Sequence, residues 1–190
     1  ASIGLVSSFM FWHLALQDYQ RQRIFSFLDP LSDPQGSGYN VLQSLRSVSS
    51  GGLFGQGVGN GVQSTIVPEM HTDFIFSGFA QEWGFIGVSV YFIVMGIFLA
   101  RLSYIAFQVH DLFSHMVIMG IVILISIQVI INIGMNLALL PVTGTTLPFL
   151  SVGGTSIVIH FMMIGIVLSI KKHRQAPGTI YMQDKYELLN

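Results

Sequence analysis

Long apolar runs alternate with polar, glycine-rich stretches along this chain. A helix that crosses a bilayer needs about 20 mainly apolar residues. The segments that come near this length are residues 1–16, 85–102, 116–135 and 149–170. A polar insert, residues 17–73, separates the first of them from the second. The pattern predicts an all-α integral membrane protein with about four transmembrane helices and one large loop that contains short helices.

The insert contains one stretch with helical periodicity, residues 39–48. Its apolar face consists of Val41, Leu42, Leu45 and Val48. Ser37 precedes the stretch as a candidate N-cap, and Gly51-Gly52 follow it, where a left-handed residue can end a helix. We therefore predict a short amphipathic helix that rests on the protein or on the membrane interface, with its polar side outward.

The composition agrees with a membrane location. Of the 190 residues, 52% are hydrophobic and only 9% are charged, and the mean hydropathy is +0.67. That is too little charge to cover a soluble globule. The net charge is -1 with only 8 Lys and Arg residues, so no phosphate-tracking surface and no nucleic-acid partner are expected. The lack of cysteine excludes disulfides and thiolate metal sites.

Basic residues near the ends of the apolar segments predict the orientation. Arg101 closes the second segment, and a basic cluster closes the last one. Because Lys and Arg favour the cytoplasmic side, both of these ends should be cytoplasmic. The insert and the loop at 136–154 then face outward, although two arginines in the insert run against the rule. Residues 173–190 should form a flexible cytoplasmic tail.

Acidic residues in the insert are the first candidates for chemistry. Asp29 and Asp33 each precede proline, a pairing that turn formation explains by itself. Glu69, His71 and Asp73 stand just before an apolar run, where carboxylates also cap helix N-termini. On residue grounds alone, turn and capping roles compete with catalysis and with metal binding.

The glycine-rich run at 51–61 has spacings like those of phosphate-binding loops. It lacks the strand of a dinucleotide fold and the Gly-Lys-Ser or Gly-Lys-Thr of a P-loop. The favoured interpretation is a compact irregular loop in which glycine permits tight turns. The alternative is that its exposed N–H groups cradle a pyrophosphate.

Several polar residues fall within apolar segments and need partners there. Glu82 should pair with Arg46 or with a backbone site, and His160 should bond to a neighbouring helix. Asn132 and Asn136 are expected to link helices. The loop at 140–156 has two prolines and several glycines, and broken backbone at membrane depth must line a cavity, which keeps a transport role open.

At this point a family resemblance becomes clear. The motifs that carry it are RQRI (21–24), LDP (28–30), DPQGSGY (33–39), GGLFGQG (51–57), PEMHTDFIF (68–76), LPVTG (140–144) and SVGGTS (151–156). Through these motifs residues 1–172 resemble the C-terminal part of the SEDS proteins (RodA, FtsW and SpoVE), with a slight preference for RodA. Members of that family have about ten spanning helices, so at ~20 residues per span this chain, which begins at Ala1 inside an apolar run, is expected to be a fragment or a processed product.

The resemblance implies a peptidoglycan glycosyltransferase that polymerises lipid II at the outer face of the bacterial cytoplasmic membrane. Asp33 matches the family's essential aspartate, as general base or as the group that orients a divalent cation, Mg or Mn. The expected protein partner is a class B penicillin-binding protein. The candidate substrate-binding residues are Glu69, His71, Asp73, Arg46, Thr143 and Ser151.

The chain departs from the family pattern at two places. Val152 stands where an aromatic residue commonly precedes the glycine pair, and Gln81-Glu82 replace two acidic residues, which weakens any metal site there. Two other functions remain open. A lipid II flippase would depend on intramembrane polar residues more than on Asp33, and a non-catalytic scaffold for the transpeptidase would tolerate loss of Asp33.

Overall fold

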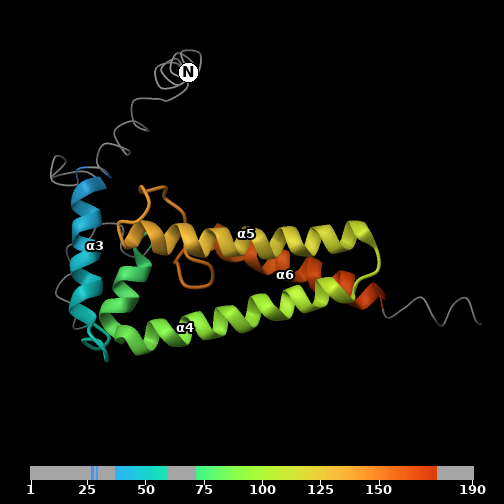
Figure 1. The fold of residues 1–190 in the computed structure, drawn as a ribbon, viewed down its shortest axis with the longest axis horizontal. Helices are drawn as coiled ribbons and strands as arrows, with labels where there is room; N and C mark the ends of the chain where they lie inside the picture. The colour runs from blue at the N-terminus through green and yellow to red at the C-terminus, as the bar shows by residue number, and fades with distance from the viewer. Residues whose placement is uncertain (1–26, 28, 30–36, 60–71, 175–190) are drawn as a thin grey trace, which may run out of the picture.

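The computed structural model describes residues 27, 29, 37–59 and 72–174. Its helices are α3 (Ser37–Gly51), α4 (Ile75–Gln108), α5 (Leu112–Asn136) and α6 (Gly154–Arg174), and these described residues contain no strand. Figure 1 shows α4, α5 and α6 side by side, with α3 lying across one end of them. The fold is therefore all-α, as predicted.

Three of the helices are long and apolar enough to cross a membrane: Ile75–Gln108, Leu112–Asn136 and Gly154–His173. They contain the segments 85–102 and 116–135 that the sequence predicted. The last helix begins at Gly154 instead of Phe149, because the chain forms a turn over 148–151 before the helix starts. The remaining predicted span, 1–16, lies outside the described residues.

The long helix α4 is kinked at Gly84, whose φ of 63° and ψ of -166° are not helical. The N–H groups of Phe85 and Ile86 leave the helix and donate to Gly52 O (2.9 Å) and Leu53 O (3.2 Å). In return, the N–H groups of Gln56 and Gly57 donate to Gln81 O (2.9 Å) and Glu82 O (3.1 Å). These four bonds between the glycine loop and α4 replace helical bonds that the kink removes.

Helix α3 packs against the part of α4 that precedes the kink. The helix ends at Gly51, and the φ of 55° at the following Gly52 is the left-handed conformation that was predicted to end it. The predicted outward polar side is wrong in part, because Gln43, Ser44 and Ser47 are buried along with Val41. Small side chains let two helix backbones approach closely, and a Cβ at Gly51 would contact the Ala80 carbonyl oxygen.

The segment between α5 and α6 folds back among the helices. Leu147 and Pro148 are buried, and the Pro148 carbonyl lies 3.4 Å from the hydroxyl of Tyr91 on α4. Phe149, with a φ of 63°, places its ring 5.4 Å from Phe98 and 5.2 Å from His160, centroid to centroid. Burial of Leu147 and Pro148 within the protein is the condition under which such non-helical chain is tolerated at membrane depth.

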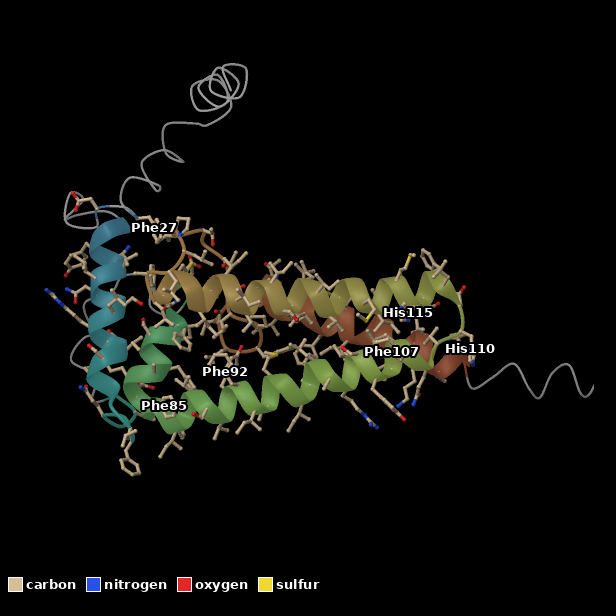
Figure 2. The ribbon with its side chains drawn as sticks, in the orientation of Figure 1. Phe27, Phe85, Phe92, Phe107, His110 and His115 are labelled. Atoms are coloured by element: carbon tan, nitrogen blue, oxygen red, sulfur yellow. The ribbon has the colours of Figure 1, made fainter. Side chains whose placement is uncertain are left out.

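A polar contact joins α6 to α5, as the sequence predicted for His160. Its Nε2 lies 3.0 Å from Gln128 Oε1, and its Nδ1 lies 2.6 Å from the carbonyl oxygen of Ser156. The ring is 2% exposed. Many apolar side chains elsewhere on the helices are exposed, among them Phe85 and Phe92 on α4 (Figure 2). Such side chains suit contact with lipid or with further transmembrane helices.

Candidate functional site

A buried polar cluster forms where α3, the start of α4, the end of α5 and the loop after α5 converge. We call it the polar junction, and its members are Ser44, Asp73, Ser77, Asn132, Asn136, Thr145 and Ser151. It lies at the end of the bundle that α3 crosses (Figure 1). Buried polar groups in such numbers are stable only when they are hydrogen-bonded to one another.

Asn136 is the centre of this junction. Its Oδ1 accepts from Ser44 Oγ (3.2 Å) and from the N–H of Ser77 (3.2 Å), and its main-chain oxygen also accepts from Ser44 Oγ (2.8 Å). Its Nδ2 donates to the carbonyl oxygen of Asp73 (3.1 Å) and to that of Asn132 (2.9 Å). One side chain therefore joins α3, α4 and α5.

Asn132, one helical turn earlier, ties the following loop to the same place. Its Nδ2 donates to the carbonyl oxygens of Asp73 (2.9 Å) and Thr145 (2.6 Å). Ser151 completes the link, because its Oγ donates to Thr72 O (2.8 Å) and accepts from the N–H of Leu147 (2.7 Å). The residues that begin α4 and the loop before α6 are thus held together by side-chain bonds to the main chain.

The carboxylate of Asp73 lies at the edge of the junction beside this loop. A Cβ built on Gly144, whose φ is 73°, would lie 3.4 Å from Asp73 Oδ2. Next to it, the exposed Thr143 has its hydroxyl 3.2 Å from that of Thr145 and 3.7 Å from Met135 Sδ. A half-buried carboxylate and two hydroxyls beside a glycine form a polar surface that could receive a hydroxyl-rich ligand.

Comparison with known proteins places the chain. The family model described as "Cell cycle protein", FtsW/RodA/SpoVE, matches residues 1–176. The chain belongs to the FtsW/RodA/SpoVE family. This confirms the resemblance on which the sequence prediction rested.

Curated relatives in this family share much of the sequence. Stage V sporulation protein E of Bacillus subtilis (strain 168) is 43% identical over 90% of this chain and 47% of its own length. Peptidoglycan glycosyltransferase MrdB of Escherichia coli (strain K12) is 38% identical over 92% of this chain and 48% of its own length. Probable peptidoglycan glycosyltransferase FtsW of Thioalkalivibrio sp. (strain K90mix) is 40% identical over 84% of this chain and 41% of its own length. The chain spans about half the length of these relatives, and the preference for RodA over FtsW stays a prediction.

A solved structure shows the same arrangement of helices. A chain from a peptidoglycan synthase complex superposes with a TM-score of 0.72 at 31% identity, covering 92% of this chain and 48% of that one. The similarity therefore extends over the membrane helices and the loops between them. It agrees with the all-α membrane fold of the family.

The structure brings together three of the family residues that the sequence proposed for the substrate. Asp73 and Ser151 belong to the polar junction, and the exposed Thr143 lies beside it, bonded to Thr145. Arg46 does not join them, because it is exposed on α3, about 200° around the helix from the buried Ser44. Asp33, Glu69 and His71 lie outside the described residues.

Asn132 and Asn136 were predicted as links between helices, and both are fully buried. Asn136 makes such links, to Ser44 on α3 and Ser77 on α4, whereas Asn132 bonds to the main chain of the loop residues Asp73 and Thr145. The sequence did not predict that the two asparagines lie beside Asp73, nor that Ser44 belongs to the same cluster. A signal existed in the spacing of Ser44, Ser47 and Gly51, a small-residue stripe on one face of α3. The prediction gave more weight to the apolar residues of the same helix.

Glu82 takes the backbone partner that was one of its two predicted alternatives. Its Oε1 accepts from the N–H of Gly59 (3.2 Å). The neighbouring Gln81 is 1% exposed, and its Nε2 donates to Gln56 Oε1 (3.3 Å). Arg46 is not the group that this carboxylate binds.

Four amides of the glycine loop are bound within the protein. The N–H groups of Gly55, Gln56, Gly57 and Gly59 all donate to protein oxygens, so the alternative interpretation of a pyrophosphate cradle is wrong for these four amides. The loop is compact and irregular, as the favoured interpretation held. Left-handed glycines at 52, 55, 57 and 59 permit its turns.

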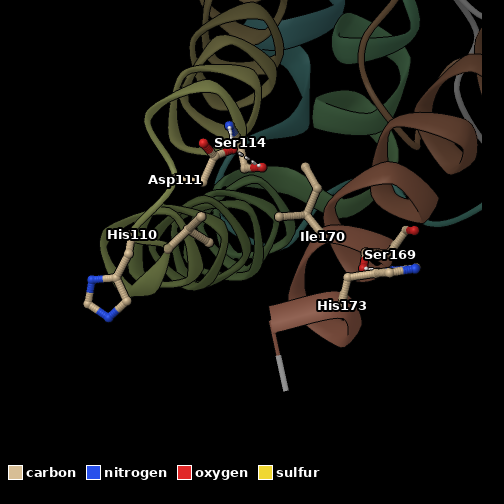
Figure 3. Close-up of a pocket in the computed structure, with 7 residues that line it drawn as sticks. His110, Asp111, Ser114, Ser169, Ile170 and His173 are labelled. Carbon is tan, nitrogen blue, oxygen red and sulfur yellow. Dashed lines mark hydrogen bonds between the residues drawn. The ribbon is translucent and has the colours of Figure 1, made fainter. Parts of the chain in front are cut away.

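A hollow (Figure 3) lies at the α4–α5 turn, the end of the bundle away from α3 in Figure 1. It has a volume of about 710 Å³ and is lined by residues of the α4–α5 turn and the end of α6, including His110, Asp111 and His173. Asp111 caps α5, and bonds from the N–H and hydroxyl of Ser114 (2.9 and 2.7 Å) hold the pKa of its carboxyl below the usual range. No predicted site residue lines this hollow, so we place the candidate site at the polar junction.

Proposed function

We propose that this chain carries the outward-facing site of a peptidoglycan glycosyltransferase that polymerises lipid II. The observation that carries the proposal is the identity of 38–40% with relatives named peptidoglycan glycosyltransferase, which extends over 84–92% of this chain. The polar junction supports it, because Asp73 and Ser151 belong to it and Thr143 lies beside it, although these three family residues proposed for the substrate are far apart in sequence.

Asp33 is proposed as the general base of the reaction. Its carboxylate would take the proton of the acceptor sugar's 4-hydroxyl as that oxygen attacks the anomeric carbon of the donor, and the lipid pyrophosphate would leave. Asp73 and Thr143, together with Glu69 and His71, would bind the sugar and pyrophosphate groups. These polar side chains fit a ligand rich in hydroxyls and phosphate oxygens.

A divalent cation, Mg or Mn, stays a prediction for this site. Among residues 37–59 and 72–174 no group of three or more His, Cys, Asp or Glu side chains is placed to hold a metal. Asp73 is the carboxylate of the junction, and Mg²⁺ is commonly held by one or two carboxylates together with substrate phosphate oxygens. Any further protein ligands would have to come from Asp33, Glu69 and His71, and no step of the proposed reaction is assigned to a metal.

The proposed location is the bacterial cytoplasmic membrane, with the polar junction outside and the end of α6 in the cytoplasm. Lys171 and Lys172 at the end of α6 support this orientation. The proposed protein partner is a class B penicillin-binding protein. Its support is the similarity to a chain solved within a peptidoglycan synthase complex.

The test is glycan-strand synthesis from purified lipid II by the full-length protein. Asp33→Ala should lower the rate at least about 100-fold, because loss of a general base typically costs 10²–10⁴-fold. Asp29→Ala is the matched control, since it removes the other Asp-Pro aspartate, for which only a turn role is proposed. Equal rates for wild type and Asp33→Ala would remove Asp33 from the mechanism. No strands from folded wild type would contradict the glycosyltransferase itself.

A further inference from the structure

Asn132 and Asn136 bind the main chain of Asp73 from two directions. The Asp73 carbonyl oxygen accepts from Asn132 Nδ2 at 2.9 Å and from Asn136 Nδ2 at 3.1 Å. Both asparagines are fully buried, so these bonds do not compete with water. The residue that carries the carboxylate is therefore anchored by α5, a helix about 60 residues later in the sequence.

The same two amides also set the position of the neighbouring segments. Asn132 Nδ2 donates to Thr145 O at 2.6 Å, which places the Thr143–Thr145 loop against Asp73. Asn136 Oδ1 accepts from the N–H of Ser77, which fixes the first turn of α4. The positions of both sides of the candidate site thus depend on two amide groups that do not themselves reach its surface.

An asparagine is well suited to this role. Its amide supplies two donors and one acceptor on a short side chain, so it can bind several main-chain groups with little freedom of its own. An apolar residue of similar size would leave the carbonyls of Asp73 and Thr145 with fewer donors in a buried place, which is costly. Both side chains hold main-chain groups of the candidate site, and Asn136 in addition links α5 to α3 and α4.

We propose that Asn132 and Asn136 are positioning residues of the glycosyltransferase site. They set the distance and angle between the Asp73 carboxylate and the Thr143–Thr145 loop, and so the geometry in which the sugar–pyrophosphate substrate is held. This inference rests on the proposed function for its effect on catalysis. Its geometric part stands independently.

The experiment uses the full-length protein in lipid nanodiscs with Asn132→Ala, Asn136→Ala and the control Ser126→Ala. Ser126 is on the same helix, but its hydroxyl bonds only to its own helix, at Val122 O (2.7 Å). Two readouts are taken: kcat and KM for strand synthesis from lipid II, and the distance between spin labels at Thr72→Cys and Thr143→Cys. Both label sites are exposed, and the 190 residues contain no other cysteine.

Either asparagine variant should lower kcat by about 10- to 100-fold, because a misplacement on the order of 1 Å is enough for such a loss. KM should change less than about 3-fold, since the groups that touch the substrate are all still present. The label distance should broaden in both variants and stay narrow in Ser126→Ala.

Two results would overturn the proposal. One is an asparagine variant that keeps kcat within about twofold of wild type. The other is a loss of activity with an unchanged, narrow label distance, because the asparagines would then act in another way. The Asn132→Ala variant removes fewer bonds than Asn136→Ala, so it decides the question if Asn136→Ala does not fold. If wild type makes no strands, the proposed function fails, and the label distances still decide whether the asparagines hold the site.

Discussion

Gly84 and Gly55 are the residues that allow the glycine loop to pack closely against α4. Gly84 has a φ of 63° and a ψ of -166°, a region that almost only glycine occupies. A Cβ on Gly84 would contact Gly55 N, and a Cβ on Gly55 would contact Glu82 O. The close approach of these two backbones is what makes the four exchanged hydrogen bonds possible.

At this scale we predict that Gly84→Ala destabilises the protein by at least about 2 kcal/mol, from backbone strain together with the clash. The measurement is thermal or SDS-driven unfolding of the purified protein. Gly96→Ala is the matched control, because Gly96 lies on the same helix with nothing within 4 Å of its Cβ position. That control should be neutral or slightly stabilising, since alanine favours helix. Equal stability of the two variants would show that the kink does not require glycine.

Among the elements, α6 is held in the bundle with little buried surface. Its 18-residue apolar window is only 17% buried, the same as that of α4, against 39% for α5. The contact between His160 and Gln128 is therefore an important tie between α6 and α5. The ring of Phe149 packs against the same histidine, so the loop before α6 shares this tie.

We predict a coupling energy of about 0.6 kcal/mol between His160 and Gln128, the average for interhelical hydrogen bonds within membranes. It would be measured as a double-mutant cycle of His160→Leu and Gln128→Leu by SDS-driven unfolding. His173→Leu with Gln128→Leu is the control cycle, because His173 also bonds to its own helix, at Ser169 O (3.0 Å), but lies at the exposed end. If the coupling energy at His160 is no larger than in the control cycle, the His160–Gln128 hydrogen bond does not stabilise the packing of α6 on α5.

For the whole molecule, the arrangement of the helices separates two ends. The glycine loop and the polar junction lie at the end that α3 crosses, and the α4–α5 turn with His110 lies at the other (Figures 1 and 2). Because α4 is long and apolar enough to span a bilayer, the residues that precede it and those that follow it should lie on opposite sides of the membrane.

A labelling experiment tests this arrangement and the proposed orientation together. Val58→Cys should react with a membrane-impermeant maleimide in intact spheroplasts, while His110→Cys should react only after the membrane is opened. Both positions are exposed, and the 190 residues of this chain contain no cysteine of their own that would react. The reverse pattern would invert the orientation, and equal labelling of both positions would argue against a membrane-spanning α4.

Much of the fold followed from local pattern. Continuous apolar runs near 20 residues predicted α5 and most of α4, because the bilayer thickness alone sets that length. The pattern did not predict that α4 begins at Ile75, since Gln81, Glu82 and Gly84 interrupt the apolar run. Those residues are compatible with helix only because the glycine loop supplies their missing backbone bonds.

The site was predictable to a smaller extent. Motif resemblance selected Asp73, Thr143 and Ser151, and the structure brings them together, whereas it leaves Arg46 apart on the exposed side of α3. No pattern within one segment could have shown that Asn132 and Asn136 hold Asp73. Their partners are about 60 residues away, and hydrogen bonds across such separations depend on how the segments pack.

The sequence by itself determined the membrane class, the central parts of the described spanning helices and the family, because hydrophobic length, turn residues and motifs are local properties of the chain. The tertiary structure alone decided that Gln43, Ser44 and Ser47 of α3 are buried, that amides of the glycine loop donate to α4, and that α5 anchors both sides of the candidate site. The reason is that buried polar groups bond to whichever partners the packing brings near, and these partners can be far away in the sequence.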